Sequence, residues 1–323
     1  MTLQSFKAFL AAILTIFFLN SVQLKGNVNY SFKHFNINNG LSQNTVFSIF
    51  QDNQGFMWFG TKDGLNRFDG SSFKIFRFSP NGSLRDNIFH RIIQDQNNQI
   101  WVGTEDGVYI YDTNKEEFIR FKEIAQNGEI INGVVSDMIM DTDGDIWMCI
   151  EGKGVYHYSF SSMKLIFFDI QVRPEGMKMM SICQGKDGNI WVLPYSRPIL
   201  RINKKTKQIS EFNLVDDEML FNDMGVVTSV LADQYHQLII GTSQKGLIEI
   251  NTITKTHRLL LENDKNSMPV YVRAVTRIDP HRLWVGTESG VYIYDEITGK
   301  VEENLRHNYF ISYSLSDNAI YSI

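Results

Sequence analysis

The clearest structural signal in the chain is Asp52-Asn-Gln-Gly-Phe-Met-Trp-Phe-Gly-Thr61, a motif that returns at a nearly constant interval. The interval is marked by tryptophan, with isoleucine at one position: Trp58, Trp101, Trp147, Trp191, Ile239 and Trp284. Successive positions are 43, 46, 44, 48 and 45 residues apart. A repeat of about 45 residues that is full of strand and turn signals is typical of a β-propeller, with one repeat per blade.

Each repeat contains four short apolar runs bounded by glycine, aspartate and asparagine. In the first repeat the runs are 46–50, 56–61, 65–69 and 73–78. Glycine, aspartate and asparagine tolerate the positive φ angles of tight hairpins, so the pattern predicts a four-stranded antiparallel meander. The first two runs are apolar on both faces, as expected where neighbouring blades cover both sides. We expect the blades to start near residues 44, 87, 134, 178, 226 and 271.

A seventh repeat begins near residue 317. Residues 314–323 match residues 83–92 position for position, which predicts the innermost strand of a further blade. Residues 30–37 resemble 73–78 and are the expected outermost strand of that same blade. The sequence therefore predicts an all-β chain with six complete four-stranded blades plus the first strand of a seventh, an incomplete seven-bladed propeller. We interpret the chain as a truncated product or a fragment of a longer protein.

The first 24 residues predict export. Lys7 is followed by the 12-residue apolar run 8–19, which is typical of a secretory signal and short for a membrane span. A small-residue cleavage site is lacking near Ser21, so an uncleaved anchor stays open as the alternative. We therefore assign residues 1–24 to a signal peptide or N-terminal anchor and residues 25–323 to the propeller.

The composition indicates one large core and no nucleic-acid partner. The 323 residues are 43% hydrophobic and 13% aromatic, and the net charge of −5 leaves no basic surface for nucleic acid. The tryptophans are predicted to pack in the core rather than to stack on a cofactor or sugar, because a position repeated in every blade is structural. Cys149 and Cys183 replace core residues and are predicted to be buried thiols, with a disulfide as the alternative.

The residues reveal no catalytic group, metal site or cofactor. The aspartates do not fit the Asp-box of sialidase-type propellers, because Asp52 and Asp95 each lie six residues before a tryptophan and the box places its aspartate five before. Asp141, Asp143 and Asp145 alternate faintly like calcium ligands, but a hairpin with Asp143-Gly144 at its tip explains them. The seven histidines show no metal-binding spacing.

The repeat resembles the two-component regulator propeller repeat of extracytoplasmic sensors in hybrid two-component systems. The resemblance is carried by residues 40–46, 52–61 and 63–70, and it recurs at 101–104 and 284–287. In that family, two seven-bladed propellers precede a β-sandwich domain, a membrane helix, a histidine kinase, a receiver and a DNA-binding regulator. Members typically sense oligosaccharides released from polysaccharides.

The resemblance implies a non-catalytic sensing module in the periplasm, with the parent protein in the inner membrane. No kinase or receiver residue can be assigned in this chain. The implied partners are a small-molecule glycan, the remaining domains of the parent sensor and a second copy in a homodimer. An exported propeller lyase or glycoside hydrolase is the alternative, and it requires Tyr, His, Arg or carboxylate groups that converge in the central channel.

Blade four holds the predicted ligand-binding residues. There the usual Gly-Thr-x-x-Gly turn is replaced by Leu193-Pro-Tyr-Ser-Arg-Pro198, which presents Tyr195 and Arg197. A tyrosine ring can stack on a sugar, and a guanidinium can bind hydroxyls or a carboxylate. Glu151 and Lys153, at the corresponding turn of blade three, are a weaker candidate pair. The alternatives are that blade four packs against a neighbouring domain and that Glu151 and Lys153 are solvated.

Overall fold

The computed structural model describes residues 30–77, 84, 87–113, 115–123, 128, 130–170, 180–194, 198–215, 225–233, 235–261 and 270–323. The chain divides into two compact units, Met1–Phe32 and Lys33–Ile323, and every assigned strand lies in the second. In the first unit, the described residues 30–32 belong to no strand. The predicted signal or anchor, residues 1–24, lies outside the described residues.

The second unit is built from six four-stranded antiparallel sheets within the described residues, and the strands of each sheet pair in sequence order. Blade one contains β1 (Val46–Gln51), β2 (Met57–Thr61), β3 (Gly64–Phe68) and β4 (Phe73–Phe76). Blade two contains β5 (Phe89–Gln94), β6 (Ile100–Thr104), β7 (Gly107–Asp112) and β8 (Glu117–Arg120). Blade three contains β9 (Val135–Met140), β10 (Ile146–Ile150), β11 (Gly154–Ser159) and β12 (Lys164–Asp169). Blade four contains β13 (Met180–Gln184), β14 (Ile190–Pro194), β15 (Ile199–Ile202) and β16 (Ile209–Phe212). Blade five contains β17 (Val227–Ala232), β18 (Gln237–Thr242), β19 (Leu247–Asn251) and β20 (His257–Leu261). Blade six contains β21 (Val272–Asp279), β22 (Arg282–Thr287), β23 (Gly290–Asp295) and β24 (Lys300–Leu305).

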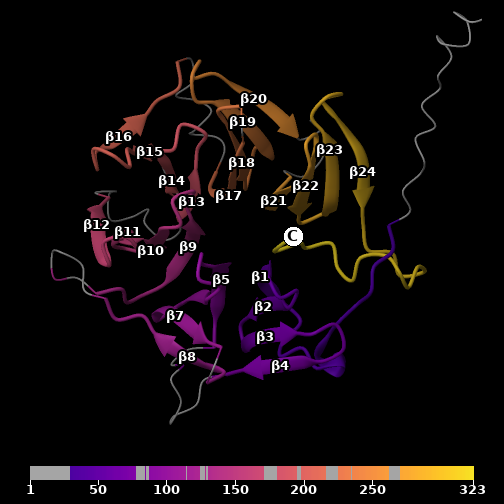
Figure 1. Cartoon of the computed structure of the whole chain (residues 1–323). Coiled ribbons are helices and arrows are strands. Elements are labelled where there is room, and N and C mark those ends of the chain that lie inside the picture. Colours follow the sequence, from indigo (N-terminus) through magenta and orange to yellow (C-terminus); the bar gives the residue numbers. More distant parts are fainter. Residues whose placement is uncertain are drawn as a thin grey trace, which may run out of the picture. The chain divides into compact units, whose positions relative to one another are not determined.

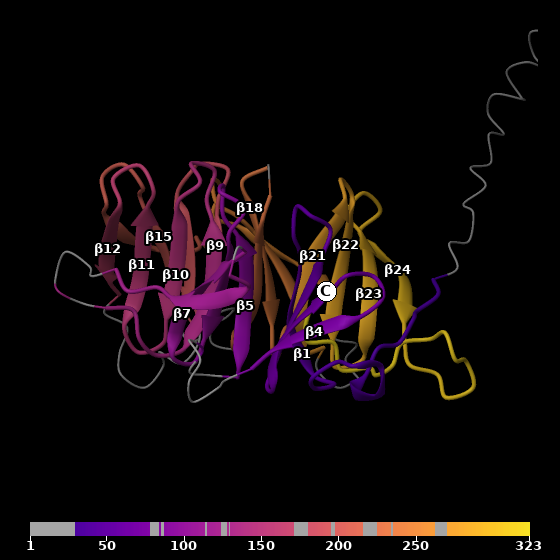
Figure 2. The ribbon, with the colours of Figure 1, turned by 60° about the horizontal axis from the view of Figure 1, so that its bottom comes forward.

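These sheets are the blades of a propeller, which confirms the predicted fold. The first strand of each blade lies toward the centre and the fourth toward the periphery (Figure 1). Viewed from the side, the strands run between two faces that carry the connecting loops (Figure 2). Because consecutive strands are antiparallel, the turns between first and second strands lie on one face. The turns between second and third strands lie on the other.

The hydrophobic core lies between successive blades, and the tryptophans form its largest members. The Trp58 ring contacts Tyr111 of the next blade at a centroid distance of 5.3 Å, and Trp101 contacts Tyr158 of the blade after that at 5.9 Å. Trp58, Trp101, Trp147 and Trp191 are at most 1% exposed. These four are core residues, as predicted. Trp284 is the exception, because it is partly exposed.

In blades one, two, five and six, the second strand carries a glycine where the following part of the chain packs closely. A Cβ atom on Gly103 would lie 2.7 Å from Cγ1 of Val135, the first residue of β9 in the next blade. At the equivalent Gly286, a Cβ atom would lie 2.8 Å from Cγ2 of Ile320. Contacts this short force the neighbouring chain to move. The glycine of the Trp-x-Gly-Thr motif therefore sets how closely one sheet approaches the next.

We expect Gly103→Ala to lower the free energy of unfolding by about 2 kcal/mol, because the added methyl group overpacks a rigid interface between two strands. Urea denaturation measures this loss. Gly286→Ala is the matched control, because Ile320 belongs to no strand and can shift away. We expect its effect to be less than half as large. Equal losses for the two variants would contradict this explanation.

The segment after β24 occupies the place predicted for the seventh blade. Gly290 donates a backbone hydrogen bond to Asn318 O at 2.8 Å, just as Gly64 donates to Asn87 O at 2.9 Å. Ile320 covers Gly286 as Phe89 covers Gly60. In the described residues, however, 316–323 form no strand, because no second strand runs beside them. The register agrees with the predicted repeat, whereas strand hydrogen bonding is lacking there.

The predicted outer strand at residues 30–37 is not formed, which corrects that expectation. In the second unit, residues 33–36 belong to no strand, and Ile37–Asn39 form a short 3₁₀ turn, η1, capped by Asn36. Phe35 instead packs on Phe68 and Phe73 of blade one, with ring centroids 4.9 and 5.6 Å apart. The resemblance to β4 therefore reflects shared aromatic packing rather than a shared strand.

Candidate functional site

The predicted pair Glu151 and Lys153 lies in the turn between β10 and β11. The Glu151 amide donates to Val134 O at 2.9 Å, and the Lys153 amide donates to Ile150 O at 3.1 Å. The Lys153 ammonium also donates to Asn132 Oδ1. These contacts tie the turn to the segment that enters β9. The other two candidates, Tyr195 and Arg197, lie outside the described residues.

A recurrent aspartate–tryptophan pair organises the opposite face. In blades one to three, one carboxylate oxygen accepts two amides of the turn between first and second strands, and the other accepts the indole N–H. The indole bonds are Trp58 Nε1 to Asp52 Oδ2 at 2.7 Å, Trp101 Nε1 to Asp95 Oδ2 at 2.8 Å and Trp147 Nε1 to Asp141 Oδ2 at 2.8 Å. The sequence reveals the six-residue spacing, but the bond itself was not predicted.

Blades four and five each carry only half of this pair. Blade four keeps Trp191 but has Gly185 at the aspartate position, and the buried Trp191 Nε1 has no hydrogen-bond partner. Blade five keeps Asp233 but has Ile239 at the tryptophan position, and Asp233 Oδ2 is buried without a hydrogen bond. A buried polar atom without a hydrogen-bond partner lowers the stability of the fold, so such atoms are uncommon in native proteins.

A candidate metal cluster in blade three is already occupied by a lysine. Ligand atoms of Asp141, Asp145 and His157 lie within 4.8 Å of one another. The Lys204 ammonium, from the next blade, lies 2.6 Å from both Asp141 Oδ2 and Asp143 Oδ2. Burial opposes ionisation of Asp141, but hydrogen bonds from Lys204 and Trp147 outweigh it and lower the Asp141 pKa. The geometry therefore matches an internal ion pair between blades.

His157 is held neutral inside this cluster. Its ring stacks on Trp147 with centroids 4.1 Å apart, and its Nε2 atom lies 3.0 Å from Asp145 Oδ2. Burial, helped by the nearby Lys207 charge, lowers the His157 pKa, while the Asp145 carboxylate opposes the shift. Protonation of this imidazole therefore favours the unfolded chain, where the pKa has its ordinary value.

We expect the free energy of unfolding to be constant above about pH 6.5 and to fall as the pH drops below it, because the unfolded state then binds the proton more readily. His157→Phe keeps the stacked ring and should flatten this dependence. Urea denaturation at about pH 7.5 and about pH 5 measures the difference. Phe310→Ala, which removes a ring that is 97% exposed and no imidazole, serves as the control and should retain the wild-type dependence. The explanation fails if both variants behave alike.

An ion pair in the central channel joins three blades. Asp137 of β9 accepts the Arg91 Nε–H of β5 at 2.6 Å and the Met138 amide at 2.8 Å through Oδ1. Its Oδ2 accepts the Ile182 amide of β13 at 3.0 Å. The Asp137 carboxylate raises the Arg91 pKa, against the effect of burial. The Arg91–Asp137 pair was not predicted from the sequence. A charged residue in an otherwise apolar first strand is the sequence feature that could have indicated it.

The channel pair borders a cavity of about 410 Å³ that also includes Cys183. Both oxygens of Asp137 accept hydrogen bonds, so this carboxylate is not placed to act as a general base. Cys149 and Cys183 are free and buried, as predicted. Burial raises the pKa of both thiols, which keeps them protonated and unreactive. Neither thiol is therefore an activated nucleophile.

Two segments of the chain, residues 40–63 and 83–106, match the family model of the two component regulator propeller. The chain carries two-component regulator propeller repeats. The matched segments cover the first two Trp-x-Gly-Thr motifs. They also contain the Asp52–Trp58 and Asp95–Trp101 pairs described above.

A curated relative is similar to this chain over a short stretch. Histidine kinase P4 of Formosa agariphila is 49% identical over 63 residues, which are 19% of this chain and 5% of the relative. No helix among the described residues of this chain is both long enough and apolar enough to cross a membrane.

Solved structures share the fold of the repeats. The extracellular domain of a putative hybrid two-component system from B. thetaiotaomicron superposes with a TM-score of 0.74 at 22% identity, over 91% of this chain and 39% of that one. The extracellular domain of a putative one-component system from the same organism gives 0.70 at 21% identity, over 87% and 39%. The chain thus spans about two fifths of these extracellular domains.

Proposed function

We propose that the chain is a non-catalytic, extracytoplasmic ligand-sensing propeller that belongs to a longer hybrid two-component sensor. In this proposal it responds to oligosaccharides released by polysaccharide breakdown and passes the response to the remaining domains of the parent, which acts as a homodimer in the inner membrane. The chain itself is placed in the periplasm. The observation that carries the proposal is the pair of regulator propeller matches at residues 40–63 and 83–106.

Three further features support this function. Structures with the same fold are described as extracellular domains of a putative hybrid two-component system and of a putative one-component system. The apolar run at residues 8–19 favours export. The partly exposed Trp284, where equivalent tryptophans are buried, marks a blade surface that a further blade can cover. This surface supports the proposal that more propeller strands follow in the parent.

The ligand-binding residues of the proposal are Tyr195 and Arg197, with Glu151 and Lys153 at the neighbouring turn. Isothermal titration calorimetry of the whole chain against a panel of plant and algal oligosaccharides tests it. We expect one glycan class to bind, and Tyr195→Ala to weaken that binding about tenfold, because a stacked ring is lost. Tyr309→Ala removes a ring that is 91% exposed in the segment after β24 and should leave affinity unchanged. Absence of binding across the panel would overturn the proposal.

The competing function is an exported propeller lyase or glycoside hydrolase. It requires a general base in the channel, and the described channel carboxylate, Asp137, has both oxygens engaged by hydrogen-bond donors. The same purified chain, incubated with the parent polysaccharides, is expected to release no unsaturated or reducing-end products. Product release that disappears in an Asp137→Asn variant would establish the enzyme instead.

A further inference from the structure

A second pocket lies between blades five and six, on the face that carries the turns between first and second strands. It has a volume of about 460 Å³ and is lined by residues 231–233, Tyr235 and residues 277–280. Glu151 and Lys153 lie in a turn between second and third strands, which puts them on the opposite face. The pocket is therefore separate from the proposed glycan loops.

Asp233 is the residue that makes this pocket unusual. Its Oδ1 atom accepts the amides of Tyr235 at 2.7 Å and Gln237 at 3.0 Å, as the equivalent aspartates do in blades one to three. Its Oδ2 atom lacks the indole N–H found in those blades, because Ile239 stands in place of tryptophan. The side chain is 3% exposed and Oδ2 accepts no hydrogen bond. A buried acceptor oxygen therefore lines the pocket without a donor.

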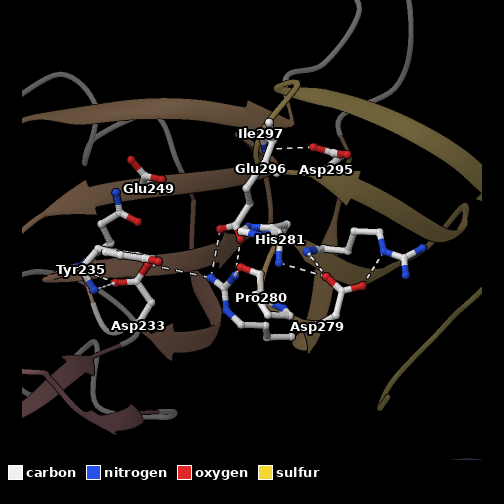
Figure 3. Close-up of polar contacts among 12 residues, drawn as sticks. Asp233, Tyr235, Glu249, Asp279, Pro280, His281, Asp295, Glu296 and Ile297 are labelled. Atoms are coloured by element: carbon white, nitrogen blue, oxygen red, sulfur yellow. Dashed lines mark hydrogen bonds and ion pairs between the residues drawn. The ribbon is translucent and has the colours of Figure 1, made fainter. Parts of the chain in front are cut away.

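The nearest cation forms an ion pair with this oxygen but no hydrogen bond. Arg277 Nη2 lies 3.8 Å from Asp233 Oδ2, too far for a hydrogen bond. The guanidinium is instead bound by both carboxylate oxygens of Glu296 and by Pro280 O at 3.2 Å. Asp233 and Glu296, both labelled in Figure 3, are the two carboxylates that approach this guanidinium. Two carboxylates thus share one arginine, which leaves one negative charge uncompensated.

The other charged groups of the pocket are already paired. Asp279 accepts the Arg282 Nε–H at 2.5 Å and the His281 amide at 2.9 Å. The buried Glu249 shown beside the pocket in Figure 3 is bound by Arg258 through both oxygens, at 2.8 and 2.7 Å. Among the described residues of the pocket, the excess negative charge therefore resides with Asp233.

Apolar and aromatic surface surrounds this charge. The Tyr235 side chain is 59% exposed at the rim, and Ile278 is 43% exposed on the other side. Leu231 and Ala232 form the wall next to Asp233. A buried carboxylate next to an aromatic face and apolar walls is the environment that an organic ammonium ion requires, because the charge is compensated and the carbon chain is removed from water.

We propose that this pocket binds a small ligand with a primary ammonium group on a short apolar body. The ammonium donates a hydrogen bond to Asp233 Oδ2 in place of the missing indole. The apolar body lies against Leu231 and Ile278, and the Tyr235 ring faces the cation. A neutral hydroxyl supplies the hydrogen bond but leaves the negative charge uncompensated, and it therefore binds more weakly.

The test titrates the intact chain with butylammonium chloride and follows binding by NMR line shifts or calorimetry. The neutral isostere 1-butanol and the donor-free cation butyltrimethylammonium are the comparison probes. We expect butylammonium to bind at least about tenfold more tightly than either one, because only it offers both charge and N–H donors. Equal binding of 1-butanol, or of the trimethyl cation, overturns the proposal.

Two variants locate the site. Asp233→Asn keeps the Oδ1 acceptor that caps the turn, and it should lower butylammonium affinity at least about tenfold. Ile239→Trp places an indole N–H toward Asp233 Oδ2, as in blades one to three, and should abolish binding when it folds. Tyr309→Ala, on the exposed loop after β24, should bind as the wild type does. If affinity is unchanged in Asp233→Asn, whose folding circular dichroism verifies, the assignment is wrong.

Discussion

Replacement of Trp101 by alanine is expected to lower the free energy of unfolding by about 4 kcal/mol. The side chain is 1% exposed and packs against Phe121 and Tyr158 with ring centroids 5.1 and 5.9 Å away. Its removal leaves a large cavity between blades two and three and leaves Asp95 Oδ2 without its indole donor. Urea denaturation followed by circular dichroism measures the loss.

Trp284→Ala is the matched control for this variant. Trp284 occupies the same repeat position but is partly exposed, so less apolar surface returns to water when its ring is deleted. We expect a loss of about half that of Trp101→Ala. If the two variants lose the same stability, burial between blades is not what the repeated tryptophan contributes.

Asp95→Ala is expected to destabilise the chain by about 3 kcal/mol. The carboxylate is buried and accepts three hydrogen bonds, from the Asn97 amide at 2.8 Å, the Gln99 amide at 2.9 Å and Trp101 Nε1 at 2.8 Å. Alanine leaves the indole N–H buried without a partner and removes the cap of the turn. Thermal and urea unfolding both measure this loss.

The comparison that isolates the indole bond is Asp233→Ala. Asp233 caps its turn through Oδ1 in the same way, but no tryptophan stands six residues later. We therefore expect a clearly smaller loss than for Asp95→Ala, of about 1 kcal/mol. A loss as large as that of Asp95→Ala would show that turn capping alone explains the aspartate.

The architecture could be predicted from the sequence because one large residue marks each blade. Trp58 and its equivalents are fixed by packing against the next blade, so their spacing reports the repeat directly. The apolar runs likewise predict strands such as β7 and β23, which share the sequence Gly-Val-Tyr-Ile-Tyr-Asp. Residues 30–37 misled the prediction, because an aromatic pattern alone does not reveal whether a partner strand is within reach.

The candidate sites were less predictable, since they depend on which polar atoms find partners in three dimensions. The sequence shows that Ile239 stands at a tryptophan position. That this leaves Asp233 Oδ2 without a hydrogen-bond donor becomes clear only from the aspartate–tryptophan bonds of the other blades. The Arg91–Asp137 pair joins first strands from two different repeats, so no local sequence motif predicts it. Tyr195 and Arg197 lie outside the described residues, so their role in ligand binding stays a proposal.

The blades that lack the aspartate–tryptophan hydrogen bond are consecutive, so local stability is expected to differ around the propeller. In blades one to three an indole N–H binds the aspartate that caps the turn. Blades four to six lack this bond, because Gly185 and Ile278 stand at the aspartate position and Ile239 at the tryptophan position. Local thermal unfolding should therefore start in the blades that lack this hydrogen bond. Amide hydrogen exchange is expected to be faster at the turns after Gln184 and Ala232 than at the turn after Gln94. The half of the propeller without these bonds can therefore flex while blades one to three stay rigid.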